Sequence, residues 1–310
     1  MKTNRSKYNL VTILGPTATG KTGFAAQLAS KLDGEIISAD SRQVYRGMDI
    51  GTGKDYDDYL VDGRAVPVHL IDIEEPGNHY NVYRFQSDFI KVYNYLQERE
   101  KFPVLCGGSG LYLEAVLKDY RLIHVPPDRK LRKSLENKSL DELTTILKGM
   151  KSDLHNITDV ETDRRAIRAI EIEIFYRNNP SAKSGMPVIK SLNTGLSFDR
   201  NSRRRRISER LKQRLDEGMI EEVRELLNSG LTTEQLIYYG LEYKYITLYL
   251  TGVLTYQEMY EKLEIAIHQF SKRQMTYFRG MEKRGTEIHW IDGDLPVEEK
   301  VDTVLSLMGV

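Results

Sequence analysis

The segment that begins at Gly15 constrains the fold more than any other part of the chain. It reads Gly-Pro-Thr-Ala-Thr-Gly-Lys-Thr and matches the phosphate-binding P-loop, a tight glycine loop that ends in lysine and threonine. The apolar run Asn9–Leu14 before it predicts a short buried strand, and Lys21–Lys31 after it predicts a helix. In this context the backbone N–H groups of the loop and of the helix start converge on an anion. The residues expected to bind this anion are Gly15, Pro16, Thr17, Ala18, Thr19, Gly20, Lys21 and Thr22.

Two side chains of the P-loop have defined chemistry. Lys21 supplies a positive charge to phosphate oxygens, and the hydroxyl of Thr22 is placed to bind Mg²⁺. The motif alone does not tell whether the ligand is a nucleoside triphosphate or another diphosphate.

Strands and helices alternate along the first part of the chain, which predicts an α/β fold with a parallel, P-loop NTPase-like sheet. The further strands are expected at Glu35–Ala39, Val66–Ile73 and Phe102–Cys106, and the further helices at Tyr83–Arg99 and Leu111–Leu117. In such sheets ligands lie beyond the carboxyl ends of the strands, so the polar loops after the strands should meet at one edge.

The pattern changes after Pro126-Pro127, where helices without strands follow. They are expected at Asp128–Glu136, Ser139–Met150 and Glu161–Arg177, and Ser139 with Glu142 forms a capping box. The segment Asn178–Asn193 is rich in Asn, Pro, Ser and Gly and predicts a linker. We therefore expect a helical insertion domain at residues 124–195 within a core formed by residues 1–123 and 196–310. The remainder of this core is expected to be long helices, with one apolar stripe from Ile207 to Leu226.

The composition predicts a soluble cytoplasmic protein. Lys and Arg together number 45, as do Asp and Glu, so the net charge gives no hint of a polyanionic partner. The one cysteine, Cys106, lies in an apolar run and is expected to be a buried strand thiol. The first eight residues lack the apolar core of a signal peptide, and no stretch is long and apolar enough to span a membrane. We expect a monomer that has no membrane partner.

Two polar loops after predicted strands carry candidate chemistry. Asp40, at the end of the second strand, is either a general base or metal ligand, or it caps the following turn. Its position beside a P-loop favours the chemical role. The glycine-rich turn Gly107–Gly110 lets the backbone approach a ligand closely, and Ser109 within it offers a hydroxyl.

Basic residues gather at three places. Arg206, Arg210 and Arg214 recur on one face of a predicted helix, after Arg203–Arg205, which we expect on a solvated surface. Arg164, Arg165 and Arg168 share a helix of the insertion, and Lys272, Arg273 and Arg279 lie near aromatic residues towards the C-terminus. Each cluster is either a charged helix face or, together with the aromatics, an RNA-binding surface.

The order and spacing of these motifs resemble the tRNA dimethylallyltransferase family, whose members prenylate an adenosine in tRNA. The resemblance spans nearly the whole chain. The matching segments are GPTATGKT from Gly15, SADSRQVYRGMDIGTGK from Ser38, HLIDIEEP from His69, YRFQSDF from Tyr83, CGGSGLY from Cys106, RRAIRAIEI from Arg164, the RI-x-x-R motif from Arg206, EGMIEEV from Glu217, GLEYKY from Gly240 and KRQMTYFR from Lys272.

The resemblance implies a reaction and a role for each matched residue. The P-loop would hold the pyrophosphate of dimethylallyl diphosphate, with Lys21 and Arg206 neutralising it and Mg²⁺ at Thr22. Asp40 would take a proton from the N6 amine of the adenosine 3′ to the anticodon, flipped into the core, and Ser109 would bond near that amine. Contacts to the anticodon stem-loop are implied for Asp40, Ser41, Arg42, Gln43, Ser109, Arg132, Arg164, Arg165, Arg168, Lys272, Arg273, Gln274 and Arg279.

The chain departs from the family pattern at three places, one of which is His155–Asp159, where the family has a His-Pro-type segment before the arginine helix of the insertion. Ser109 replaces the usual threonine and keeps the hydroxyl, and GLEYKY differs from the commoner Gly-Tyr form. Three other activities have to be weighed: prenyl transfer to free adenine nucleotides, a P-loop small-molecule kinase, and an RNA-binding protein with a vestigial P-loop. The helical insertion and the basic–aromatic segment argue against the free nucleotide. The sequence has no adenine-specific feature for a kinase, and intact Lys21, Asp40 and Arg206 argue against lost catalysis.

Overall fold

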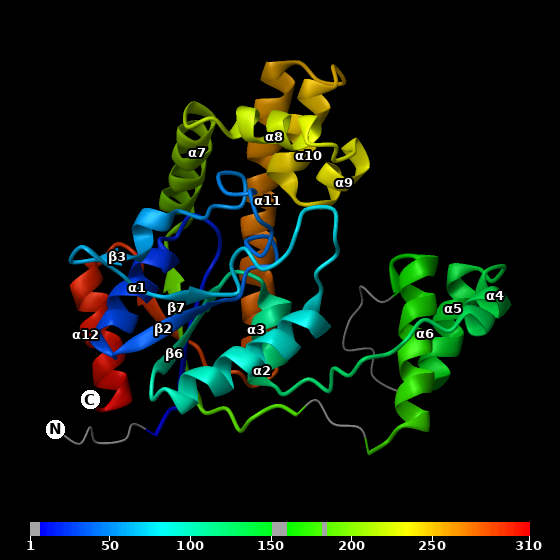
Figure 1. The fold of residues 1–310 in the computed structure, drawn as a ribbon, viewed down its shortest axis with the longest axis horizontal. Helices are drawn as coiled ribbons and strands as arrows, with labels where there is room; N and C mark the ends of the chain where they lie inside the picture. Colours follow the sequence, from blue (N-terminus) through cyan, green and yellow to red (C-terminus); the bar gives the residue numbers. More distant parts are fainter. Residues whose placement is uncertain (1–6, 151–159, 182–184) are drawn as a thin grey trace. The chain divides into compact units, whose positions relative to one another are not determined.

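A computed structural model describes residues 7–150, 160–181 and 185–310, and the chain divides into two compact units (Figure 1). The first unit contains the chain up to Tyr120 together with Met186–Val310, and the second is Arg121–Gly185. The insertion expected at residues 124–195 is therefore too long at its C-terminal end. Residues Ser191–Ser197 form a strand of the first unit, and this strand includes the last three residues of the expected linker.

The first unit is an α/β structure built around one sheet. Its strands are β1 Leu10–Leu14, β2 Gly34–Ser38, β3 Leu60–Val61, β4 Arg64–Ala65, β5 Val68–His69, β6 Phe102–Gly107, β7 Ser191–Ser197 and β8 His289–Asp292. Its helices are α1 Lys21–Lys31, the 3₁₀ helix η1 Tyr56–Tyr59, α2 Val82–Glu98, α3 Gly110–Leu117, α7 Arg200–Asp216, α8 Met219–Asn228, α9 Thr233–Tyr238, α10 Leu241–Leu250, α11 Tyr256–Lys283 and α12 Val297–Met308.

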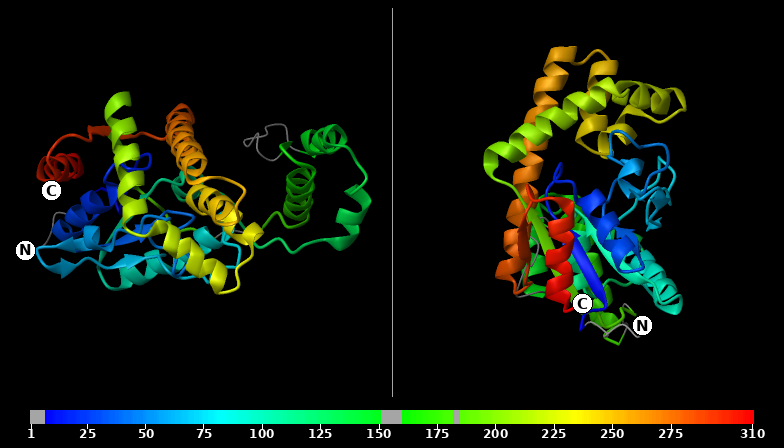
Figure 2. Two further views of the ribbon diagram at one scale, coloured as in Figure 1. Left: turned by 90° about the horizontal axis from the view of Figure 1, so that it is seen from above. Right: turned by 90° about the vertical axis from the view of Figure 1, so that its left-hand side faces the viewer.

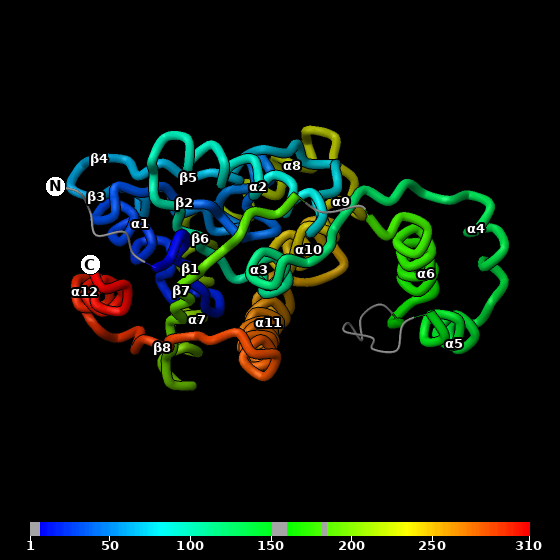
Figure 3. Tube along the Cα trace, turned by 90° about the horizontal axis from the view of Figure 1, so that it is seen from below, coloured from blue at the N-terminus to red at the C-terminus, as the bar shows by residue number. Residues whose placement is uncertain are grey.

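Six strands form the main sheet in the order β5-β2-β6-β1-β7-β8, and every pair in it is parallel. This confirms the predicted parallel α/β class. Apolar residues of β1 explain why the sheet has two covered faces. Val11 and Ile13 belong to the core under α1 and α12, whereas Leu10 and Leu14 belong to the core under α2, α3 and α11. Figure 3 shows these two groups of helices on opposite sides of the sheet.

Three expectations about elements of the first unit were wrong. The strand expected at Val66–Ile73 is only β5, because Leu70 and Asp72 adopt left-handed backbone angles that end the extended chain. The single apolar stripe is divided between α7 and α8, since Gly218 between them is also left-handed, with φ of 101°. Strand β8 lies where only helices were expected. Helices α7 and α11, far apart in sequence, lie side by side (Figure 2).

The described residues of the second unit form the helices α4 Arg129–Leu135, α5 Leu140–Met150 and α6 Asp163–Asn178. They enclose a small core of leucine, alanine and isoleucine side chains. The predicted capping box before α5 is confirmed, because the N–H of Ser139 donates to Glu142 Oε2 at 2.8 Å and the N–H of Glu142 donates to Ser139 Oγ at 3.4 Å. No helix in the described part of the chain is long and apolar enough to cross a bilayer.

Candidate active site

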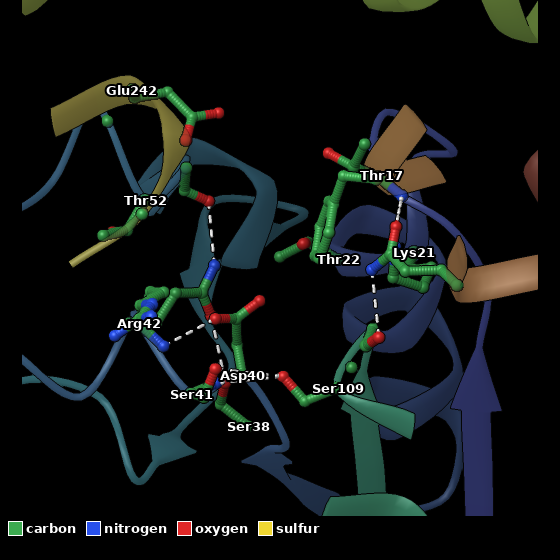
Figure 4. Close-up of a pocket in the computed structure, with 18 of the residues that line it drawn as sticks. Thr17, Lys21, Thr22, Ser38, Asp40, Ser41, Arg42, Thr52, Ser109 and Glu242 are labelled. Carbon is green, nitrogen blue, oxygen red and sulfur yellow. Dashed lines mark hydrogen bonds between the residues drawn. The ribbon is translucent and has the colours of Figure 1, made fainter. Parts of the chain in front are cut away.

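The loops that follow β1, β2 and β6 meet at the carboxyl edge of the sheet, as expected for a parallel sheet (Figure 4). The loop after β2 touches the glycine-rich turn after β6 directly. The N–H of Ser41 donates to Ser109 Oγ at 3.1 Å, and the N–H of Ser109 donates to the carbonyl of Ala39 at 3.4 Å. Ser109 is therefore held next to the loop that carries Asp40.

The P-loop leads into α1 without a side-chain cap. Gly20, the residue before the helix, has a left-handed backbone and no side chain, so nothing from this residue covers the first N–H groups of α1. Lys21 bends back over the loop, where its Nζ donates to the carbonyl of Pro16 at 2.6 Å and to Thr19 Oγ1 at 3.3 Å. Burial lowers the pKa of Lys21 to about 8. An anion in the loop would meet both the free N–H groups and this ammonium.

Gln274 of α11 joins the P-loop to the glycine-rich turn. Its Oε1 accepts from the N–H of Thr17 at 2.9 Å, and its Nε2 donates to the carbonyl of Gly108 at 2.9 Å. The side chain is buried. Both ends of the amide are thus engaged within the protein, and a tRNA contact by Gln274 stays a prediction.

Arg206 of α7 reaches the P-loop, as its predicted role requires. Its Nε donates to the carbonyl of Ala18 at 3.0 Å, and its guanidinium lies 4.7 Å from the ring centre of Phe198. These two contacts fix the side chain beside the loop while the other N–H groups of the guanidinium remain available for an anion.

The loop after β2 is ordered by its own side chains. Asp40 Oδ1 accepts from the N–H of Arg42 at 2.8 Å, so Asp40 does cap its turn, but it also lines a cavity. Gln43 bonds to Ser38 Oγ and, through Nε2, to the carbonyl of Gly53 at 2.9 Å. The two roles considered for Asp40 are therefore compatible, because capping uses one carboxylate oxygen and leaves Oδ2 for chemistry.

Two cavities open next to the P-loop. The first, about 330 Å³, is lined by Asp40, Arg42, Ser109 and Phe270 among others. The second, about 860 Å³, has a rim rich in carboxylates. These carboxylates are Asp49, Asp55, Asp57, Asp58, Glu209 and Glu217. Lys21 and Thr22 line both cavities, so the P-loop lies where the two meet.

Several site residues carried no assigned role in the sequence. Glu222 of α8 accepts from the N–H groups of Asp49, Ile50 and Gly51 at 2.7–3.0 Å and from the hydroxyl of Tyr243 at 2.7 Å, which holds the loop before η1. Glu242 of α10 projects into the first cavity (Figure 4), and burial raises its pKa. Both residues lie in segments that match the family, Glu222 in EGMIEEV and Glu242 in GLEYKY. The sequence does not show, however, that these segments pack near the P-loop.

The basic residues predicted to contact tRNA fall into two groups. In the described part of the chain, Arg164, Lys272 and Arg279 are exposed and have no ion pair, and Arg273 lies over the ring of Phe270. Arg165 pairs with Glu161. Arg203, expected on a solvated face, is instead partly buried, and burial and the nearby Arg279 and Arg200 lower its pKa.

Two more of the arginines predicted to contact tRNA hold the second unit together. Arg132 donates to both oxygens of the buried Glu171, at 2.9 and 2.8 Å, and Arg168 also pairs with it. Burial alone would raise the pKa of Glu171, but the hydrogen bonds from Arg132 and Arg168 lower it to about 2. Their contact with tRNA stays a prediction.

Thr22 and Asp58 line the same cavity beside the P-loop, and their hydroxyl and carboxylate oxygens are of the kind that bind Mg²⁺. Thr22 stands at the start of α1, and a Cβ placed on the next residue, Gly23, would lie 3.9 Å from the carboxylate of Asp58. In the described residues no three His, Cys, Asp or Glu side chains surround a common point. A metal here would therefore depend on hydroxyl and carboxylate oxygens of the chain and on oxygens of the ligand, which suits Mg²⁺.

Comparison with known proteins yields one consistent family. A model of the IPP transferase family matches residues 43–281. The chain is 59% identical over 302 residues to a protein named tRNA dimethylallyltransferase 2 from Phocaeicola vulgatus, covering 97% of this chain and 98% of that one. It is 60% identical to a tRNA dimethylallyltransferase 1 from Parabacteroides distasonis, with 97% and 98% covered.

Solved structures agree with this result. A full-length tRNA isopentenylpyrophosphate transferase from Bacillus halodurans aligns with a TM-score of 0.71 at 32% identity, covering 98% of this chain and 96% of that one. A eukaryotic dimethylallyltransferase crystallised while acting on tRNA aligns with a TM-score of 0.74 at 22% identity, covering 97% of this chain and 77% of that one, and shows the shared fold.

Proposed function

Since the chain belongs to the IPP transferase family, we propose that it transfers a dimethylallyl group from dimethylallyl diphosphate to N6 of the adenosine 3′ to the anticodon in tRNA, releasing diphosphate. The observation that carries this proposal is the position of Asp40 and Ser109 in the same cavity as Lys21 and Thr22. A carboxylate and a phosphate-binding loop thus line one cavity.

The donor would bind with its diphosphate in the P-loop. The uncapped N–H groups of α1, the ammonium of Lys21 and the guanidinium of Arg206 all stabilise negative charge there. As the bond between C1 of the prenyl group and the bridging oxygen breaks, that oxygen gains charge and C1 gains cationic character. Donors already in place at the loop favour this step because they need no rearrangement.

The acceptor amine would enter from the side of Asp40. The new bond forms between N6 of adenine and C1 of the prenyl group, and the amine must lose one proton. Asp40 Oδ2 can accept that proton while Oδ1 keeps its hydrogen bond to Arg42. Ser109, fixed by Ser41, offers a hydroxyl to the same base.

The two cavities suit two separate entrances. The lining of the second cavity carries six carboxylates and five cations, whereas the lining of the first carries two carboxylates and four cations, so the first is the more favourable one for a polyanion such as tRNA. The first cavity has Arg42 and the half-exposed Phe270 on its lining, and cationic and aromatic groups attract phosphates and stack on bases. We assign tRNA to the first cavity and the donor, as a magnesium complex of lower charge, to the second.

We propose Mg²⁺ as the cofactor, held by Thr22 and diphosphate oxygens, with Asp58 nearby. The bound ion would neutralise part of the charge on the diphosphate. We further propose that the protein acts as a monomer in the cytoplasm. Its only cysteine, Cys106, is buried and forms no disulfide, as expected in a reducing compartment.

The deciding experiment offers two acceptors. The purified protein is incubated with radiolabelled dimethylallyl diphosphate and Mg²⁺, and with either unmodified tRNA or AMP. Label is expected on tRNA and absent from AMP. Label on AMP alone would assign the chain to free-nucleotide prenylation, and no label on either acceptor would overturn prenyl transfer.

A further inference from the structure

The residues shared by the two cavities have one kind of charge. Lys21, Thr22, Arg210 and Arg214 line both cavities, and no carboxylate does. Three cations and a hydroxyl therefore border both cavities. Lys21 and Thr22 belong to the P-loop, but Arg210 and Arg214 come from α7 and have no role in the reaction described so far.

A glycine makes room for both arginines. A Cβ on Gly53 would lie 2.1 Å from Arg214 Nη2 and 2.7 Å from Arg210 Nη2. Both distances are shorter than a van der Waals contact, so any residue other than glycine would collide with the two guanidiniums. Gly53 also has a φ of 74°, in the left-handed region that favours glycine. The two guanidiniums thus pack directly against the backbone of the loop before η1.

The two guanidiniums share one carboxylate. Arg210 Nη2 donates to Asp55 Oδ2 at 2.7 Å, whereas Arg214 Nη2 is 3.7 Å from the same oxygen. Arg214 Nη2 is buried and has no hydrogen-bond partner in the described part of the chain. A buried cationic N–H group without an acceptor is energetically unfavourable. An anion that accepts its hydrogen bond would therefore bind favourably at this site.

Glu242 does not supply the missing acceptor. It lies in the first cavity with both arginines, but no hydrogen bond or ion pair links its carboxylate to either of them among the described residues. Burial raises the pKa of Glu242, which favours its neutral form and weakens any compensation of the arginine charge.

From this arrangement we propose that Arg214, assisted by Arg210, binds the diphosphate of the donor from the side opposite the P-loop. The proposal rests on the proposed function for the identity of the donor, although diphosphate binding can be measured without any acceptor. Guanidinium groups bind phosphate oxygens through paired, charge-assisted hydrogen bonds, and Arg214 has the unused donor. The diphosphate would then be enclosed by cations on both sides as it leaves.

The test is the substitution Arg214→Met, which removes the guanidinium, keeps an unbranched side chain and leaves Asp55 paired with Arg210. Affinity for inorganic pyrophosphate with Mg²⁺ is measured by calorimetry, and KM is measured for dimethylallyl diphosphate and for tRNA. We expect about tenfold weaker pyrophosphate binding and a similar rise in KM for the donor, with KM for tRNA unchanged, since a lost charge-assisted hydrogen bond corresponds to about a factor of ten.

The matched control is Arg205→Gln on the same helix, whose side chain is 69% exposed and which should bind pyrophosphate as the unaltered protein does. Should Arg214→Met fail to fold, Arg214→Gln is measured in the same way. A folded Arg214 variant with unchanged pyrophosphate affinity would overturn the proposal and leave Arg214 a structural residue. If pyrophosphate binding depends on Arg214 but no tRNA is prenylated, the proposed function fails and this inference stands.

Discussion

The carboxylate of Asp40 shows how one residue can serve structure and chemistry. Its Oδ1 holds the turn that carries Arg42, and the same side chain lines the cavity shared with Lys21. A substitution that keeps the turn but removes the base can therefore separate the two roles.

Asp40→Asn should lower kcat by about 10²–10⁴, the usual contribution of a general base. The amide oxygen of asparagine can still accept from the N–H of Arg42, so the fold and pyrophosphate binding should stay unchanged. Initial rates of label transfer to tRNA, measured at saturating donor, check this. Retention of the full rate by Asp40→Asn would remove Asp40 as the base.

The buried ammonium of Lys21 predicts a pH dependence. Burial lowers its pKa to about 8, so the free enzyme loses this charge as the pH rises through 8. Because the charged form binds diphosphate, kcat/KM for the donor should be constant below pH 8 and fall up to tenfold per pH unit above it.

The pH profile of kcat/KM, compared with that of Lys21→Arg, checks this prediction. Arginine stays charged throughout, so the variant should lose the decline above pH 8 even if its overall rate is lower. A decline of equal size and midpoint in both proteins would show that another group titrates.

At this scale the sequence predicts residues that belong to a motif and misses those placed by tertiary structure. The P-loop, Asp40, Ser109 and Arg206 were expected, and the structure brings them to one edge of the sheet. Arg214 was seen only as part of a basic stripe. Its position against Gly53 depends on the packing of segments that are far apart in the sequence, and no local sequence pattern predicts such packing.

Among the elements, the helices were easier to predict than the strands. Helix α1 begins and ends at the residues expected, because its sequence is long and has a clear P-loop before it. The first three residues of strand β7 were assigned to a linker because they end a segment rich in Asn, Pro, Ser and Gly, although the strand lies next to the central strand β1. Its partners, and not its composition, make it a strand.

The helices of the second unit depend on a buried carboxylate. Glu171→Ala should destabilise this unit by about 2–3 kcal/mol, because Arg132, Arg168 and the N–H of Asp128 lose their acceptor. The value is below that of a fully buried pair since the two arginine side chains are 44% and 40% exposed. Hydrogen exchange of the α6 amides measures the loss.

Glu161→Ala is the matched control, since its pair with Arg165 is exposed and should contribute at most about 0.5 kcal/mol. The pKa of Glu171 is lowered to about 2, so its stabilising effect should be complete above the unfolded value of about 4.3 and disappear as the pH falls towards 2. Equal losses of stability in the two variants would contradict the proposed stabilising role of Glu171.

On the scale of the whole molecule, charge is sorted although the net charge is zero. Carboxylates outnumber cations by six to five along the second cavity and cations outnumber carboxylates by four to two along the first, while exposed Lys272, Arg273 and Arg279 lie along α11. The α/β core with a helical insertion follows from the sequence pattern. The distribution of charge over the cavities cannot be read from that pattern, because it arises only when α7, α10 and α11 pack against the loops of the sheet.

The central claim is that one adenosine of tRNA, next to the anticodon on its 3′ side, receives the prenyl group at N6. The most direct measurement is mass spectrometry of a nuclease digest of unmodified tRNA after reaction with the protein, dimethylallyl diphosphate and Mg²⁺. The account predicts a single fragment heavier by one dimethylallyl group, containing that adenosine, and a nucleoside modified at N6. A prenyl group on another nucleotide or another atom, or an unmodified digest, would contradict it.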